Sequence, residues 1–103
     1  MLANTSIDRV IAVLRHDRGT TWRELYSTLF AFGVVCAPEL EPAYEADELP
    51  PVAVVMLPGS AKHWVVKQDD LIYDPNGSIY AVDELRFRVG PANEQIKYAT
   101  VER

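Results

Sequence analysis

The sequence predicts an α+β fold in which two N-terminal helices pack on a mainly antiparallel sheet. Amphipathic helical spacing is confined to the chain before residue 34, and short β-branched and aromatic runs separated by turn residues fill most of the remainder. The chain has 103 residues, 49% of them hydrophobic, which is enough to bury a core without metals or disulfides. We therefore expect one domain over residues 1–103.

The first helix is expected from Ser6 to about His16. Its apolar residues recur at helical spacing, at Ile7, Val10, Ile11 and Leu14. Thr5 or Ser6 is positioned to cap the helix N-terminus. The Arg18-Gly19 pair is expected to end the element.

The second helix has clear signals at both ends. Thr21-Trp22-Arg23-Glu24 matches a capping box, in which the side chains of the first and fourth residues bond each other's backbone N–H. Apolar residues follow at helical spacing: Trp22, Leu25, Tyr26, Leu29 and Phe30 or Phe32. Gly33 is expected to supply the C-terminal stop.

Short strands are expected after the helices. A brief extended piece is predicted at 34–37 and a proline-rich, irregular surface loop or arm at 38–51. A buried strand is expected at 52–57, because that apolar run is bounded by prolines. Further extended segments are predicted at 78–82, 86–89 and 96–101, with one turn of helix at 83–85.

A hairpin is predicted over residues 62–77, and its turn decides the register. A three-residue loop would put His63 and Asp74 on opposite sheet faces. The alternative is a two-residue turn at Asp69-Asp70. That turn sets Gln68 opposite Leu71 and Val66 opposite Tyr73. His63 and Val65 then share a sheet face with Asp74 and Asn76. The diagonal separation of the His63 and Asp74 Cα atoms would be about 7–8 Å, so the two side chains are expected to meet.

These motifs resemble the papain-like cysteine peptidase superfamily over roughly residues 5–80. The resemblance lies in the Thr-Trp-Arg-Glu-Leu helix, the apolar strand, His63-Trp64-Val65-Val66 and the Tyr-Asp-Pro-Asn-Gly turn. It is closer to the small bacteriocin-leader-processing and phage-borne branch. The resemblance implies that His63 corresponds to the catalytic histidine and Asp74 to the aspartate that orients it.

The sequence departs from this family at the nucleophile. The family's cysteine opens the first long helix, and the matching position here falls at Thr5 or Ser6. Cys36, the one cysteine, follows the second helix instead and is expected to be a small buried residue. A retained fold with lost peptidase chemistry is therefore expected, while Cys36, Ser6 and Thr5 stay open as alternative nucleophiles.

Acidic residues are concentrated in one segment. The net charge is −5, and five of the fifteen acids lie between residues 39 and 48, where no Lys or Arg occurs. The other ten acids balance the ten basic residues, so no basic face for nucleic acid is expected. A partner protein with a basic surface is expected to dock on residues 38–51, the proline-rich stretch that contains these acids. The predicted contact residues are Glu39, Glu41, Tyr44, Glu45, Asp47 and Glu48.

Two functions follow from these patterns. The first is a catalytically inactive papain-like domain that binds another protein as an inhibitor or accessory module. The alternative is a divergent hydrolase that uses His63 and Asp74, and a subunit that needs its partner to complete a site is also open. No cofactor or metal is expected, because the two histidines lack metal-site spacing. No targeting segment or membrane-spanning run is visible, so a cytoplasmic location is expected.

Overall fold

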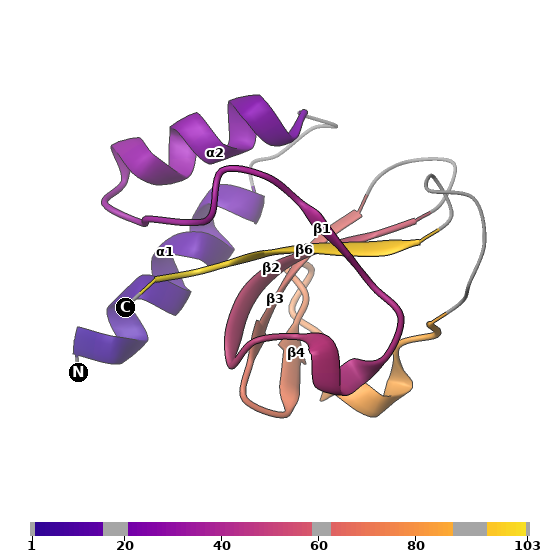
Figure 1. The fold of residues 1–103 in the computed structure, drawn as a ribbon. Helices are drawn as coiled ribbons and strands as arrows, with labels where there is room; N and C mark the ends of the chain where they lie inside the picture. Colours follow the sequence, from indigo (N-terminus) through magenta and orange to yellow (C-terminus); the bar gives the residue numbers. More distant parts are fainter. Residues whose placement is uncertain (1, 16–20, 59–62, 88–94, 103) are drawn as a thin grey trace.

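The computed structural model describes residues 2–15, 21–58, 63–87 and 95–102, with the backbone alone for residues 2–6. It contains a six-stranded sheet in the order β1-β6-β2-β3-β4-β5, in which every neighbouring pair is antiparallel. Two helices lie together on one face of the sheet (Figure 1). The predicted α+β arrangement is confirmed.

The elements follow in chain order. The helices are α1 (Leu2–Arg15) and α2 (Trp22–Ala31), and two short 3-10 helices are η1 (Ala46–Glu48) and η2 (Val82–Glu84). The strands are β1 (Glu41–Ala43), β2 (Val52–Leu57), β3 (His63–Gln68), β4 (Leu71–Tyr73), β5 (Ile79–Ala81) and β6 (Ile96–Thr100).

Helix α1 buries its predicted apolar stripe, with Ile7, Val10 and Leu14 each 5% exposed or less. It begins earlier than expected, at Leu2, so Thr5 and Ser6 lie inside the helix. The N-cap prediction for these two residues is wrong. Hydroxyl residues are favoured at caps but are also tolerated inside helices, so their presence does not by itself set a boundary.

Helix α2 is closed at both ends as its sequence predicts. The Glu24 N–H donates to Thr21 Oγ1 at 3.3 Å, and the Thr21 N–H donates back to Glu24 Oε1 at 3.2 Å. At the other end the Val34 N–H donates to the Leu29 carbonyl and the Gly33 N–H to the Phe30 carbonyl. These two bonds form a Schellman motif, which requires the left-handed φ of +85° found at Gly33.

Replacement of Gly33 by alanine is expected to lower the free energy of unfolding by about 1–2 kcal/mol, because L-residues are strained in the left-handed region. An added Cβ would also lie 3.0 Å from Arg9 Nη1. Urea unfolding monitored by circular dichroism measures the loss. Gly33→Asn is the matched control, since it adds the same Cβ but tolerates positive φ. Equal losses in both variants would contradict the backbone explanation.

The sheet separates two apolar clusters. The helix-side cluster joins α1 and α2 to one face of the sheet, through Val52, Val54, Met56, Trp64, Val66 and Val101. The opposite face carries a second cluster, formed by Ala43, Leu49, Ala53, Val55, Val65, Ile72, Val82 and Ile96. Side chains alternate between faces along a strand, so consecutive residues of β2 and β3 feed different clusters.

The second face is covered by connecting segments, and this explains two wrong predictions. Residues 38–51 are not wholly irregular, because Glu41–Ala43 pairs with β6 as an edge strand and η1 follows it. The predicted strand at 86–89 is also wrong where it is described. Residues 86 and 87 are in no regular element, and Phe87 packs on the second cluster. Residues 88 and 89 lie outside the described residues.

The β3–β4 hairpin has the predicted register. Gln68 pairs with Leu71 and Val66 with Tyr73, around the two-residue Asp69-Asp70 turn. Asp69 has a left-handed φ of +54°, which Asp tolerates better than most residues. The expected extended piece at 34–37 is present as a bridge between Cys36 and Val101. The strand and helical turn expected at 78–85 appear as β5 and η2.

Candidate functional site

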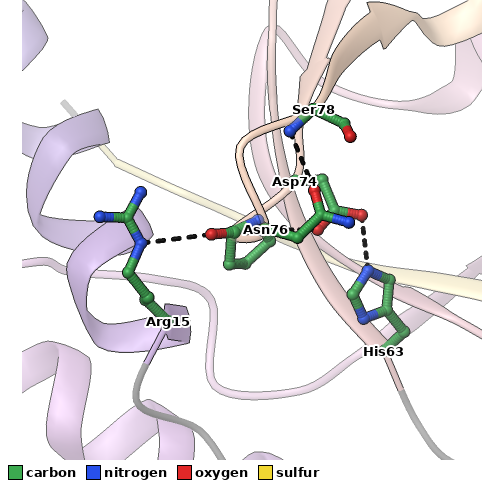
Figure 2. A network of polar contacts seen from close by, with 6 residues as sticks. Arg15, His63, Asp74, Asn76 and Ser78 are labelled. Carbon is green, nitrogen blue, oxygen red and sulfur yellow. Dashed lines mark hydrogen bonds and ion pairs between the residues drawn. The ribbon is translucent and has the colours of Figure 1, made fainter.

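The turn between β4 and β5 holds Asp74 in place. Pro75 and Asn76 occupy its corner, and Gly77 takes a positive φ of +105° while its N–H donates to the Asp74 carbonyl at 2.9 Å. The Asn76 N–H donates to Asp74 Oδ1 at 2.9 Å. Asn76 Oδ1 in turn accepts the Ser78 N–H at 2.9 Å (Figure 2). The Asp-Pro-Asn-Gly sequence therefore fixes the carboxylate locally.

His63 meets this carboxylate, as the hairpin register predicts. His63 Nε2 lies 2.6 Å from Asp74 Oδ2 (Figure 2). The Asp74 side chain is 8% exposed, whereas that of His63 is 49% exposed. An ionised carboxylate only accepts hydrogen bonds, so Nε2 is the donor in the His63 tautomer that pairs with an ionised Asp74. Nδ1 is then the ring nitrogen left to bind or exchange a proton with another group.

Helix α1 approaches this pair with its last residue. Arg15 Nε donates to the Pro75 carbonyl at 3.2 Å, which joins the end of α1 to the Asp74 turn (Figure 2). Thr5 and Ser6 lie ten and nine residues earlier in the same helix. At 1.5 Å per residue, that separation is roughly 13–15 Å along the helix axis. The contact therefore joins the C-terminal end of α1 to the Asp74 turn.

The sheet also separates the histidine from the candidate nucleophiles. Trp64 and Val66 belong to the helix-side cluster and Val65 to the opposite one. By strand alternation His63 is on the face opposite the helices. Cys36 is a member of the helix-side cluster, and α1 packs on that same side. The described residues thus bring His63 and Asp74 together, with α1 and Cys36 in the other layer.

Cys36 has the environment of a structural thiol. It is 3% exposed, in agreement with the prediction of a small buried residue. Burial, and secondarily the charge of Glu102, raises the pKa of Cys36 to about 11. Nucleophilic cysteines need an accessible, stabilised thiolate, which this environment disfavours.

Tyr80, whose position was not predicted, lies on the same sheet face as Asp74. It pairs with Ile72 across the β4–β5 ladder and packs on the second cluster. Burial raises the pKa of Tyr80, with further contributions from the charges of Asp74 and Glu84. Extending the hairpin register by one strand would have found it, because Tyr80 and Asp74 then lie on the same face.

The six predicted contact residues of the acidic segment are all exposed. Glu41 pairs with Tyr98 in the β1–β6 ladder, and Tyr44 is 42% exposed. Glu48 differs from the others, because its Oε1 accepts the backbone N–H groups of Tyr44 and Glu45. Its carboxylate therefore stabilises the segment from within.

Comparisons with protein-family models, curated proteins and solved structures find no match to this chain. The papain-like resemblance thus rests on the sequence motifs. Among the described residues, no group of three or more His, Cys, Asp or Glu side chains is arranged to hold a metal ion. Within the same residues, no helix has the length and apolar character needed to cross a membrane.

Replacement of Asp74 by alanine is expected to lower the free energy of unfolding by about 1–2 kcal/mol, because Asn76 N–H and His63 lose their acceptor. Asp74→Asn is the control, since its side-chain oxygen still accepts the Asn76 N–H. The Asn variant is expected to retain at least half of the stability that the Ala variant loses. Chemical denaturation measures both variants, and an Asn variant as unstable as the Ala variant would contradict the turn-capping role.

Proposed function

We propose that this protein is a catalytically inactive domain of papain-like ancestry that binds another protein through its acidic segment, residues 39–48. The partner presents a basic surface. A cytoplasmic location belongs to the same proposal, and so does a role as an inhibitor or accessory module. The observation that carries the proposal is the way the segment holds exposed carboxylates at fixed positions.

Residues 44–48 of the acidic segment are anchored on both sides. Ala43 is fully buried and Leu49 is 6% exposed, so both flanks belong to the second apolar cluster. Between them, the Glu48 carboxylate accepts two backbone N–H groups and closes the η1 turn. Tyr44, Glu45 and Asp47 project from this closed turn. A prearranged surface loses less conformational entropy on binding than a free arm, which favours recognition.

The position of the histidine supports a binding role over a catalytic one. Acyl transfer by this family's chemistry needs a thiolate at a helix N-terminus beside the imidazole. Here the C-terminal residue of α1 contacts the Asp74 turn. The single thiol is buried and its pKa is raised by burial. The hairpin register and the Asp74 turn explain the contact between His63 and Asp74 without a catalytic role.

Affinity capture from extracts of the native host tests the acidic segment. Glu41→Gln, Glu45→Gln and Asp47→Asn together remove three exposed charges and leave Glu48 in place. Asp8→Asn, Glu24→Gln and Glu102→Gln form the matched control, with the same change in net charge at exposed positions elsewhere. Glutamine at position 24 keeps the oxygen that accepts the Thr21 N–H. A specific partner is expected to be lost at least tenfold with the first triple variant and kept with the control. Equal recovery with both variants would reject the proposal.

Hydrolysis is a second candidate function, favoured by the 2.6 Å contact between His63 Nε2 and Asp74 Oδ2. In this alternative His63 acts as the general base for a nucleophile among Cys36, Ser6 and Thr5. Fluorophosphonate and iodoacetamide probes with mass-spectrometric mapping test it directly. Labelling of one of these residues that disappears in His63→Ala would favour the hydrolase. Absence of His63-dependent labelling would reject the hydrolase and favour the binding function.

A further inference from the structure

The two edges of the sheet differ in their capacity to pair with another strand. β1 contains Pro42, which has no N–H to donate, and an exposed acid at Glu41. Proline and charge are the features by which proteins protect edge strands. β5, with the sequence Ile79-Tyr80-Ala81, contains neither. The sequence of β5 therefore contains no residue that would block the addition of another strand.

The hydrogen-bond pattern shows which backbone groups of β5 point outward. The Asp74 N–H donates to the Ser78 carbonyl and the Val82 N–H to the Asp70 carbonyl, both at 2.9 Å. Residues in an antiparallel ladder alternate between facing the neighbouring strand and facing away. Tyr80 therefore faces β4, and Ile79 directs both its N–H and its carbonyl away from the sheet. The next outward N–H, that of Ala81, already donates to Glu84 Oε2 at 3.2 Å.

An exposed apolar strip lies beside this outward-facing pair. Ile79 is 60% exposed and Leu71 is 41% exposed. Both are on the sheet face that carries Tyr73, which packs on the helix-side cluster. These side chains extend the helix-side face beyond the area that α1 and α2 cover. A strand added to β5 would bury Ile79 together with its backbone groups.

One end of this edge is strongly acidic. The Val82–Asp70 backbone bond brings the β3–β4 turn next to η2. Four exposed carboxylates therefore gather there, on Asp69, Asp70, Asp83 and Glu84. The other end of β5 leads back to Ser78 and the Asp74 turn. Among the described residues, a ligand lying along β5 thus meets a group of exposed carboxylates at its η2 end, and complementarity requires a positive charge at that end.

We propose that the β5 edge binds an extended peptide by antiparallel strand addition, with an aliphatic residue opposite Ile79 and a Lys or Arg on its N-terminal side. An antiparallel strand runs from η2 toward the Asp74 turn, so its N-terminal part lies over the four carboxylates. Its central residue exchanges two backbone hydrogen bonds with Ile79. This edge is distinct from β1, the strand that the acidic segment contributes, which lies at the other end of the strand order.

A peptide is a better occupant of this edge than a second copy of the chain. β5 has three residues, so pairing two copies along it would bury much less than the roughly 1,200–2,000 Å² of a stable protein interface. Two copies would also bring like-charged chains together, since each carries a net charge of −5. A short basic peptide avoids the charge repulsion, and peptide recognition by strand addition relies on backbone hydrogen bonds and single side chains rather than on a large buried area.

Selection from a displayed library of random seven-residue peptides tests this proposal on the full chain. Enriched peptides are expected to carry Lys or Arg on the N-terminal side of Val, Ile or Leu. Ile79→Lys is expected to weaken their binding at least tenfold, measured by fluorescence anisotropy with the synthetic peptides. Phe30→Lys is the matched control, because Phe30 on α2 is 63% exposed and belongs to neither proposed binding surface, and it is expected to weaken binding less than twofold.

A second variant distinguishes loss of peptide binding from loss of folding. Ile79→Pro removes the outward N–H without disturbing a bond to β4, and it is expected to fold like the wild type by circular dichroism while binding at least tenfold more weakly. The proposal is overturned if no peptide is enriched, or if the enriched peptides bind both Ile79 variants as well as the wild type. A dimer that sedimentation equilibrium detects and that Ile79→Lys dissociates would assign the edge to a second copy instead.

Discussion

Between pH 9 and pH 11, the wild type is expected to lose about 2–3 kcal/mol more of its free energy of unfolding than the Cys36→Ala variant loses. Burial raises the pKa of Cys36 from 9.0 to about 11 in the folded chain. A raised pKa means that the folded state keeps the proton longer than the unfolded state does. The resulting stability is fully present below pH 9 and is lost as the pH rises through the folded pKa.

Urea unfolding of both proteins at intervals from pH 8 to pH 11 measures this difference. Burial also raises the pKa of Tyr80 and Tyr98 and lowers that of Lys67. These contributions are present in both proteins. The difference between their free energies of unfolding, plotted against pH, therefore reports the titration of the Cys36 thiol alone. A difference that stays constant with pH would contradict the burial of Cys36. The folded wild type is also expected to resist iodoacetamide at pH 8, because the thiol is 3% exposed.

The Lys67→Ala variant is expected to lose about 2–3 kcal/mol of unfolding free energy, because it removes the packed methylenes and leaves the Pro50 carbonyl without its donor. Lys67 is 6% exposed, and its Nζ donates to the Pro50 carbonyl at 2.8 Å. The neighbouring Asp69 N–H donates to the Pro51 carbonyl at 2.7 Å. These bonds tie the end of the acidic segment to β3 and the hairpin turn.

Chemical denaturation and amide hydrogen exchange measure the two parts of this effect. Lys67→Met retains most of the side-chain stem, so it is expected to lose about 1 kcal/mol. Exchange at the Asp69 amide is expected to rise in the Ala variant, because the strap formed by residues 50 and 51 loosens. A stable Ala variant with unchanged exchange would show that Lys67 does not hold this strap.

The pH dependence of the Lys67 variants has the opposite sign to that of Cys36. Burial lowers the pKa of Lys67, although the charges of Asp69 and Asp70 act in the other direction. The folded state therefore disfavours the protonated amine, and this penalty is relieved as the pH rises through the lowered pKa toward 10.5. The wild type should gain stability relative to Lys67→Met over that window.

The parts of the fold that were predictable depend on residues close together in the sequence. The capping box of Thr21 and Glu24 spans three residues, and the Asp69-Asp70 turn joins adjacent strands. Once that turn is known, the two-residue period of a strand puts His63 and Asp74 on one face. The central pair of the candidate site could thus be predicted because a tight turn transmits the register without help from other segments.

The parts that were mispredicted depend on distant segments. The sequence of Glu41–Ala43 has a proline and an acid and little strand propensity, yet it pairs with β6 more than fifty residues later. Thr5 and Ser6 favour a cap, yet the helix extends past them to Leu2. Phe87 alternates with charged residues as in a strand, yet it packs over the second cluster instead. In each case the sequence offered only the local conformational preference of these residues. Packing against distant segments had the larger effect on the structure.

By itself, the sequence determined the two-helix and antiparallel-sheet class, the boundaries of α2 and β2, the end of β3, and the meeting of His63 with Asp74. Tertiary structure alone decided that the C-terminal end of α1 contacts the Asp74 turn through Arg15, that Cys36 lies in the opposite layer from His63, and that β5 is the last strand of the sheet within the described residues. The physical reason is the range of the interactions. Caps, turns and alternation act over a few residues, whereas layer order and helix direction follow from burying apolar faces that are far apart in the chain.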